Sequence, residues 1–194
     1  FSAYLIDRNA YPLIDTVPAY LAPDGPMISI GRVCFAEALR REQVITEMIK
    51  LLYRASDTGV KVKLIIRGIT CILPGRKDLS ENIEAISIVD RFLEHARIFI
   101  FHNGGNKKIY CSSADLMERN LSFRIETAFP LYDKDIKEQI LYLMDLQWRD
   151  NVKARTLNNQ HLNTYRKISS TISIRSQLET YNYFKNLTRL QKGE

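Results

Sequence analysis

The residues best suited to chemistry lie between positions 64 and 126, at the ends of short apolar segments. Arg67 closes one apolar run, and His95 and Arg97 open another. Polar side chains follow a third run: Ser112, Ser113, Asp115, Arg119, Asn120 and Arg124. The ends of strands are where an α/β sheet places its ligands. One imidazole among arginines, without paired carboxylates, suits a phosphorylated ligand, because a guanidinium group matches phosphate oxygens and keeps its charge.

Each of these residues also has a plain structural interpretation. Arg67 can be a surface side chain paired with Glu81 or Glu84. His95 has the chemistry of a nucleophile, a proton carrier or a phosphate ligand. A histidine taken alone is nevertheless more often a hydrogen-bonded structural residue. The grouping of these residues, rather than any one of them, favours a ligand site.

Two short motifs are ambiguous in the same way. Residues 103–105, Asn-Gly-Gly, resemble a phosphate-binding glycine loop. They lack the trailing Lys-Ser/Thr of a P-loop, however, and Asn-Gly is the commonest tight hairpin turn. Ser112, Ser113 and Asp115 are typical of the start of a helix, here 116–120, whose free N–H groups can bind an anion. A plain turn and a plain helix cap remain open alternatives at these positions.

Hydrophobic spacing predicts the elements that position these residues. Helical spacing over 41–56, then Gly59 as a C-terminal cap and a strand over 60–66, indicate one unit of an α/β sheet. The segment 67–81 is predicted to be a polar loop. The other elements expected are loop over 1–30 with a short strand at 27–30, a helix at 86–93, strands at 97–101, 108–112 and 127–131, a helix at 133–148 capped by Asp133, an irregular segment after it, and a last helix that opens with a capping box of Ser176 and Glu179.

Composition is typical of a soluble globular protein of one domain. The 194 residues are 45% hydrophobic and 26% charged, and no apolar run approaches the roughly 20 residues that cross a bilayer. Three cysteines, odd in number and without a CxxC pair, argue against a disulfide framework and a zinc site and for a reducing cytoplasm. The first residues lack both an initiator Met and the layout of a signal peptide, which suggests a fragment.

The net charge of +6 is concentrated toward the C-terminus. Residues 147–194 carry nine basic and three acidic side chains, and residues 60–126 carry eleven and eight. A basic field raises the local concentration of a polyanion, so a non-catalytic polyanion- or nucleic-acid-binding module is one candidate function. An ordinary solvated basic surface explains the tail equally well. No aromatic cluster interleaved with the basic residues offers a base-stacking platform.

Several short phrases occur in a specific order along the chain. They are RAS at 54–56, IRGI at 66–69, LSENI at 79–83, RFLEH at 91–95, NGG at 103–105, SSAD at 112–115, RNL at 119–121, QWRDNVKA at 147–154 and IRSQ at 174–177. In this order they resemble the C-terminal catalytic domain of the larger, histidine-dependent polyphosphate kinases, whose fold is related to phospholipase D. The resemblance runs from about residue 47 to residue 186.

The resemblance implies an α/β fold with a mixed β-sheet flanked by helices, phospholipase D-like, over residues 41–194, after a poorly matched segment or linker at 1–40. It also implies reversible transfer of the terminal phosphate of ATP to inorganic polyphosphate through a phosphohistidine, with ATP or ADP and Mg²⁺ bound. Arg67 and His95 match the family's ATP-binding residues. The further candidates for phosphate or polyphosphate contacts are Arg97, Asn103, Ser112, Ser113 and Arg119.

Phosphoryl transfer depends mainly on positioning and charge stabilisation. We therefore expect Arg67 to neutralise nucleotide phosphate oxygens. His95 is expected to have an auxiliary catalytic role, in which it donates a hydrogen bond beside the transferred group. An obligatory proton donor matters less, because the departing phosphate of ADP is weakly basic, with a second pKa near 6 by analogy with phosphoesters.

Important parts of the family's pattern are missing. The family's phosphorylated histidine lies in a Thr-His-Ala-Lys type motif of the preceding domain, and no such motif occurs here. Its metal-associated arginines and a nucleotide-contacting tyrosine also lie upstream, so no metal ligand is expected in this chain. Residues 31–35, Gly-Arg-Val-Cys-Phe, stand where a Lys-Met-Asn type segment is expected. We therefore expect a quarter to a third of an enzyme, inactive alone.

The resemblance also implies partners and a location. We expect ATP, inorganic polyphosphate, the remaining domains of the enzyme and further copies of it as partners, and no nucleic acid. The expected location is the cytoplasm, with association at the membrane periphery as an open alternative. The main alternative function is a phospholipase D-type phosphodiesterase, which would need a lysine two residues after the histidine, where Arg97 stands.

Overall fold

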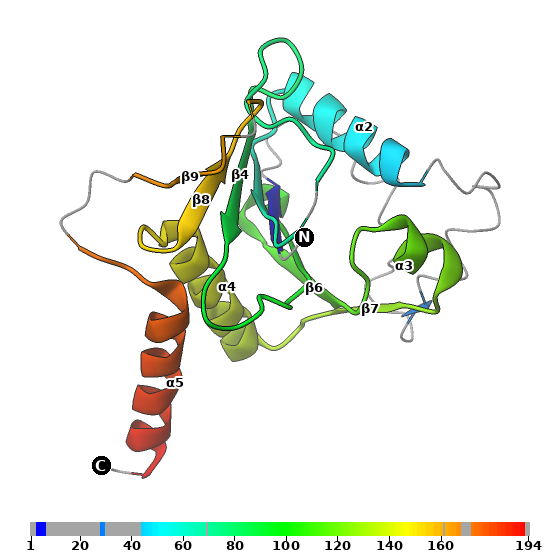
Figure 1. The fold of residues 1–194 in the computed structure, drawn as a ribbon. Helices are drawn as coiled ribbons and strands as arrows, with labels where there is room; N and C mark the ends of the chain where they lie inside the picture. Colours follow the sequence, from blue (N-terminus) through cyan, green and yellow to red (C-terminus); the bar gives the residue numbers. More distant parts are fainter. Residues whose placement is uncertain are drawn as a thin grey trace.

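The computed structural model describes residues 3–6, 28–29, 44–68, 70–160, 162–167 and 172–192. In this part of the chain, nine strands form one sheet with the order β2-β7-β6-β5-β1-β3-β4-β8-β9 (Figure 1). The strands are β1 (Ala3–Ile6), β2 (Ile28–Ser29), β3 (Val62–Ile65), β4 (Ile83–Ile88), β5 (Ile98–Phe101), β6 (Lys108–Ser112), β7 (Thr127–Pro130), β8 (Ala154–Leu157) and β9 (Thr164–Tyr165).

The sheet is mixed, and its strand directions bring several strand ends to one edge. β3 is parallel to β4 and β1 is parallel to β5, while the other neighbours are antiparallel. Ile65 and Ile98 are both in register with Ala3, and Cys111 is in register with Ile98. Consequently β3, β4 and β6 end where β5, β7 and β8 begin. We call this the site edge.

Helices cover both faces of the sheet. The helices are α2 (Val44–Asp57), α3 (Glu118–Phe123), α4 (Lys134–Arg149) and α5 (Ser176–Lys192). Figure 1 shows α2 and α4 on different sides of the sheet, and α5 extending away from it. α5 packs against α4 through the rings of Tyr183 and Tyr142, whose centroids lie 4.7 Å apart.

Two cores fill the space between the sheet and its helices. Val62 and Leu64 pack with Leu52 of α2, and Ile65 packs with Met144 of α4. Successive side chains of a strand point to opposite faces, so the two helices lie on opposite faces. Full burial of each such aliphatic side chain contributes about 1.5–3 kcal/mol. The predicted α/β class, with a mixed sheet flanked by helices, is confirmed.

Most predicted elements are confirmed. The helix predicted at 41–56 is α2, and the strand predicted at 108–112 is β6 with the same bounds. Asp133 caps α4 as predicted, because its Oδ1 accepts a hydrogen bond from the backbone N–H of Ile136 at 2.9 Å. The strands predicted at 60–66, 97–101 and 127–131 are β3, β5 and β7.

The helix predicted at 86–93 is wrong, because this segment begins with the second half of strand β4. Ile86, Val89 and Leu93 have helical spacing, but Val89 and Leu93 are 65% and 72% exposed. The buried isoleucines of β4 are β-branched and favour an extended backbone between two neighbouring strands. β3 and β8 provide those neighbours.

The N-terminal region contains more strand than predicted. Loop is predicted for most of 1–30, yet Ala3–Ile6 forms β1 between β3 and β5. A four-residue apolar run is too short to show a period, and its partners lie far along the chain. The short strand predicted at 27–30 is confirmed as β2. Most of the segment 1–40, including 31–35, lies outside the described residues.

The C-terminal region differs from prediction in two ways. β8 and β9 form in a segment for which irregular structure is predicted. α5 begins at Ser176 as predicted, but the capping box is wrong. The Ser176 hydroxyl donates to Asp150 Oδ2 at 2.8 Å, and the backbone N–H of Glu179 donates to the carbonyl of Arg175. A carboxylate from another part of the chain thus replaces the local cap.

Candidate functional site

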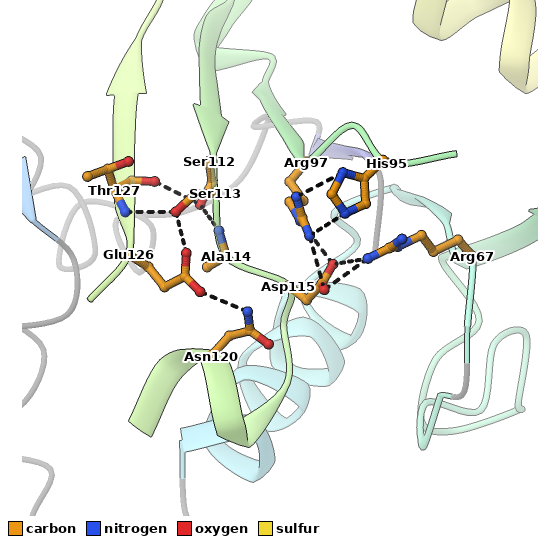
Figure 2. Close-up of polar contacts among 10 residues, drawn as sticks. All are labelled: Arg67, His95, Arg97, Ser112, Ser113, Ala114, Asp115, Asn120, Glu126 and Thr127. Carbon is orange, nitrogen blue, oxygen red and sulfur yellow. Dashed lines mark hydrogen bonds and ion pairs between the residues drawn. The ribbon is translucent and has the colours of Figure 1, made fainter. Parts of the chain in front are cut away.

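Three charged side chains from three strand ends meet at the site edge (Figure 2). Arg67 follows β3, Arg97 precedes β5 and Asp115 follows β6. Arg67 Nη2 donates to both carboxylate oxygens of Asp115 at 2.9 Å. Arg97 donates to the same oxygens through Nε at 3.0 Å and Nη2 at 3.2 Å. Arg67 therefore pairs with Asp115, and its interpretation as a surface partner of Glu81 or Glu84 is wrong.

The two arginines keep Asp115 ionised. Hydrogen bonds from Arg97 hold the pKa of the Asp115 carboxyl well below its usual range, and those from Arg67 act in the same direction. Burial alone would raise this pKa and is outweighed. Two guanidinium groups and one carboxylate leave a surplus of one positive charge. This surplus favours an anionic ligand over a cation.

The donors of the two arginines are used differently. Arg97 donates to Asp115 through Nε and Nη2. Its Nη2 and Nη1 also lie within hydrogen-bonding distance of His95. Arg67 contacts Asp115 through Nη2 alone. Within the described part of the chain, Nε and Nη1 of Arg67 have no partner. A guanidinium group held in place with open N–H donors is suited to binding phosphate oxygens.

His95 is exposed and lies directly beside Arg97 (Figure 2). Its Nε2 lies 2.9 Å from Arg97 Nη2, and its Nδ1 lies 3.5 Å from Nη1. Because a guanidinium group only donates, the shorter contact requires a lone pair on Nε2. The longer contact makes the same demand on Nδ1, so the tautomer decides which ring nitrogen accepts from Arg97. The His-x-Arg spacing in the sequence is compatible with this contact, because residues i and i+2 of an extended chain point the same way.

The two predicted serines support the backbone beside this cluster. Ser112 Oγ accepts from the N–H of Ala114 at 3.0 Å and donates to the carbonyl of Thr127 at 3.2 Å. Ser113 Oγ accepts from the N–H of Thr127 at 3.0 Å and contacts the carboxylate of Glu126. These hydroxyls are engaged within the protein. They tie β6 to the start of β7.

The helix cap predicted for Ser112, Ser113 and Asp115 is wrong. α3 begins at Glu118, and its N-cap, Met117, makes no side-chain capping bond. The side chains of Ser112 and Ser113 instead make the contacts with the start of β7, and that of Asp115 makes the ion pairs with the two arginines.

A second polar contact joins Asn120, one of the polar residues noted in the sequence, to Glu126, which was not identified there. Asn120 is 2% exposed and its Nδ2 donates to Glu126 Oε1 at 2.8 Å, while no described residue pairs with its Oδ1. No local pattern marks this pair.

The remaining predicted contacts do not join the cluster. Arg119 is exposed on α3. Asn103 follows β5 and precedes β6, which places it at the sheet edge opposite Arg97. Four strand residues at about 3.3 Å each separate the two edges by roughly 13 Å. Asn103, Gly104 and Gly105 all have positive φ, and Asn103 Nδ2 donates to the carbonyl of Asn106, so this segment is a tight turn.

The described residues do not fit a dedicated metal site. Within the described ranges, no group of three or more His, Cys, Asp or Glu side chains could hold a metal ion. Both carboxylate oxygens of Asp115 accept hydrogen bonds from guanidinium groups, so this carboxylate is poorly suited to act as a metal ligand. Cys71 is an exposed free thiol and Cys111 a partly buried one. No helix in the described residues is long and apolar enough to cross a membrane.

The fold is an α/β domain with two arginines paired to one aspartate at one sheet edge. A family model described as polyphosphate kinase C-terminal domain 2 matches residues 42–177. The chain belongs to the polyphosphate kinase family, in the part that this C-terminal domain covers.

Individual polyphosphate kinases agree with this assignment. One from Vibrio vulnificus (strain YJ016) is 46% identical over 150 residues, which are 76% of this chain and 21% of that protein. One from Escherichia coli (strain K12) is 46% identical over 140 residues, covering 72% of this chain and 20% of that protein. The chain thus spans about a fifth of the length of these curated relatives.

A solved structure shows the same fold. The crystal structure of polyphosphate kinase from Porphyromonas gingivalis matches with a TM-score of 0.71 and 34% identity, over 96% of this chain and 28% of that one. The resemblance seen in the sequence and the phospholipase D-like α/β fold that it implies are confirmed. The phosphodiesterase alternative receives no support from these matches.

Proposed function

We propose that this chain forms part of the ATP site of a polyphosphate kinase. The complete enzyme transfers the terminal phosphate of ATP reversibly to inorganic polyphosphate, through a phosphohistidine in another part of the enzyme. The observation that carries the proposal is the pair of open donors on Arg67, next to His95 at the site edge. A loose phosphoryl transition state needs positioned positive charge more than covalent participation.

The residues divide into direct and supporting roles. Arg67 binds nucleotide phosphate oxygens through Nε and Nη1. His95 donates a hydrogen bond beside the transferred group. Arg97 was a candidate for direct phosphate contact, but its donors are spent on Asp115 and His95, so we assign it to positioning. Arg119 remains a candidate contact for polyphosphate.

Several parts of the proposed activity belong to other regions of the enzyme. Mg²⁺ would neutralise phosphate charge when bound with the nucleotide, and we place its protein ligands outside the described residues, because the acid at the site is engaged by arginines. We expect the complete enzyme to act in the cytoplasm and to self-associate.

Titration of the chain with ATP, ADP, inorganic tripolyphosphate and polyphosphate tests the proposal. A nucleotide site predicts saturable one-to-one binding that prefers ATP over tripolyphosphate. A non-specific polyanion module predicts no such preference and a steep loss of affinity between about 50 and 200 mM salt. Incubation with labelled ATP and Mg²⁺ should leave the chain unlabelled. Stable phosphorylation of His95 would contradict the roles assigned here.

A further inference from the structure

The segment that carries His95 has little packing of its own. Residues 89–95 connect β4 to β5 without helix or strand. Val89, Phe92 and Leu93 are 65%, 68% and 72% exposed, so no apolar side chain among these three anchors the segment. A hydrogen-bonded partner must therefore fix the position of His95.

Gln177, in the first turn of α5, provides such a partner. Its Oε1 accepts from the N–H of Phe92 at 3.0 Å, and its Nε2 donates to the carbonyl of Phe92 at 2.7 Å. The side-chain amide thus pairs with this residue's backbone as a neighbouring strand would. The same Nε2 donates to Glu94 Oε1 at 2.8 Å, and Gln147 of α4 donates to Glu94 Oε2 at 2.6 Å.

Arg175 holds the other end of the segment. Its Nε and Nη2 donate to Asp90 at 2.8 and 2.6 Å, in the two-bond geometry that makes arginine–carboxylate pairs specific. The Asp90 side chain is 2% exposed, and the Arg175 hydrogen bond lowers the pKa of its carboxyl. The start of α5 is itself fixed, because Asp150 Oδ2 accepts from the N–H and hydroxyl of Ser176.

We propose that Arg175, directly before α5, and Gln177, in its first turn, are positioning residues, which hold segment 89–95 and thereby set His95 against Arg97. α5 otherwise extends away from the sheet (Figure 1), so its first turn is the part that matters to the site. The catalytic consequence rests on the proposed function. The position of His95 against Arg97 does not depend on the proposed function, because it is defined without bound nucleotide.

Gln177→Glu is the most informative single change. It removes the donor to the Phe92 carbonyl and places a carboxylate against Glu94. We expect the amides of 90–97 to exchange about ten- to hundredfold faster, the range for losing a hydrogen bond to a charged group. We also expect the ring ¹⁵N shifts of His95 to change, because the ring is no longer held against Arg97. Gln191→Glu, the same change at an exposed position of α5, should alter neither.

A double variant tests whether the contact itself is responsible. Adding Glu94→Gln to Gln177→Glu restores an amide–carboxylate pair with its direction reversed. It should recover part of the amide protection and of the His95 ring signature, because the donor to the Phe92 carbonyl stays absent. If Gln177→Glu does not fold, Gln177→Ala is measured by the same two readouts.

Two results would overturn the proposal. One is an unchanged His95 ring signature and unchanged exchange of 90–97 in a folded Gln177 variant. The other is a double variant that behaves like the single one. ATP titration of the wild-type chain keeps the two claims separate. Absence of ATP binding together with a shifted His95 signature would refute the proposed function and leave the positioning role intact.

Discussion

Two shielded aspartates at the same edge of the sheet occupy opposite kinds of environment. Asp150 is 0% exposed, and its Oδ1 accepts from the backbone N–H groups of 152–154. Its Oδ2 accepts from the N–H and hydroxyl of Ser176. Asp115 instead accepts, among the described residues, from the guanidinium groups of two arginines.

The difference separates a purely structural carboxylate from one in the proposed ligand site. Four backbone N–H groups and the Ser176 hydroxyl donate to Asp150, and each of these donors is used in that bond, so this carboxylate joins α4, β8 and α5. The donors that satisfy Asp115 belong to charged side chains, and one of them, Arg67, retains N–H groups beyond the ion pair. A shielded acid is therefore a better candidate for a binding site when its partners are charged side chains that keep further N–H donors.

The largest expected effect is on stability at Asp150. Asp150→Ala leaves five hydrogen-bond donors without their acceptor and should lower the free energy of unfolding by about 3–5 kcal/mol. Urea unfolding measures the change. Asp145→Ala, which removes an exposed i,i+4 pair with Arg149, should cost about 0.5 kcal/mol or less. A loss of less than about 1 kcal/mol in Asp150→Ala would contradict the structural role that distinguishes Asp150 from Asp115.

Asp115→Asn should weaken ATP binding rather than strengthen it. The substitution raises the local charge by one unit, and simple attraction would then favour the nucleotide. It also loosens the two arginines that the carboxylate holds. We expect the loss of preorganisation to dominate, with about 30-fold weaker binding, equivalent to about 2 kcal/mol. Tighter binding in calorimetric titration would show that charge alone sets the affinity.

His95 should contribute a smaller, hydrogen-bonding effect. His95→Ala should weaken ATP binding by about tenfold, within the range for an unsatisfied partner, and His95→Gln by less, because an amide N–H partly replaces the imidazole N–H. His102→Ala, at the opposite sheet edge, serves as the control and should leave binding unchanged. Equal losses in the Gln and Ala variants would point to proton transfer instead.

The smallest expected effect is the acid dependence of stability at Asp115. Its native pKa is lowered from the ordinary value of 3.8. The unfolded state therefore binds the proton more readily, and the stabilisation is present above about pH 5 and is lost as pH falls below about 4. Urea unfolding across this range should show a steeper loss in the wild type than in Asp115→Asn. If the free energy of unfolding fell equally with pH in the wild type and in Asp115→Asn, the Asp115 carboxylate would not be stabilised by ion pairs with the arginines.

Local spacing predicted most elements because each buries its own apolar face. It failed at 86–93, because Ile86, Val89 and Leu93 have helical spacing although Ile86 belongs to strand β4 and the other two are exposed. A helix cap was left open as an interpretation of Asp115, because the Ser-Ser-x-Asp pattern is the same whether the carboxylate accepts from backbone N–H groups or from arginines. Only the strand order, which brings Arg67 and Arg97 to one edge, separates the two cases.

The supports of the His95 segment could not be predicted from the sequence. Gln147 lies 53 positions from its partner Glu94, and Gln177 lies 83 positions away. Hydrogen bonds over such separations depend on how α4 and α5 dock, and no local period records that. By contrast, Arg67 and His95 were named from the sequence because their motifs resemble a known family.

Arg67 is the residue on which the proposed function depends most. Calorimetric titration of ATP into the wild type, Arg67→Ala, Arg67→Lys and the control Arg76→Ala, an exposed arginine of the following loop, tests it directly. We expect at least about tenfold weaker binding in Arg67→Ala, partial recovery in Arg67→Lys, which lacks the planar donor fork, and no change in Arg76→Ala. Wild-type affinity in Arg67→Ala would contradict the assignment of this edge as the nucleotide site.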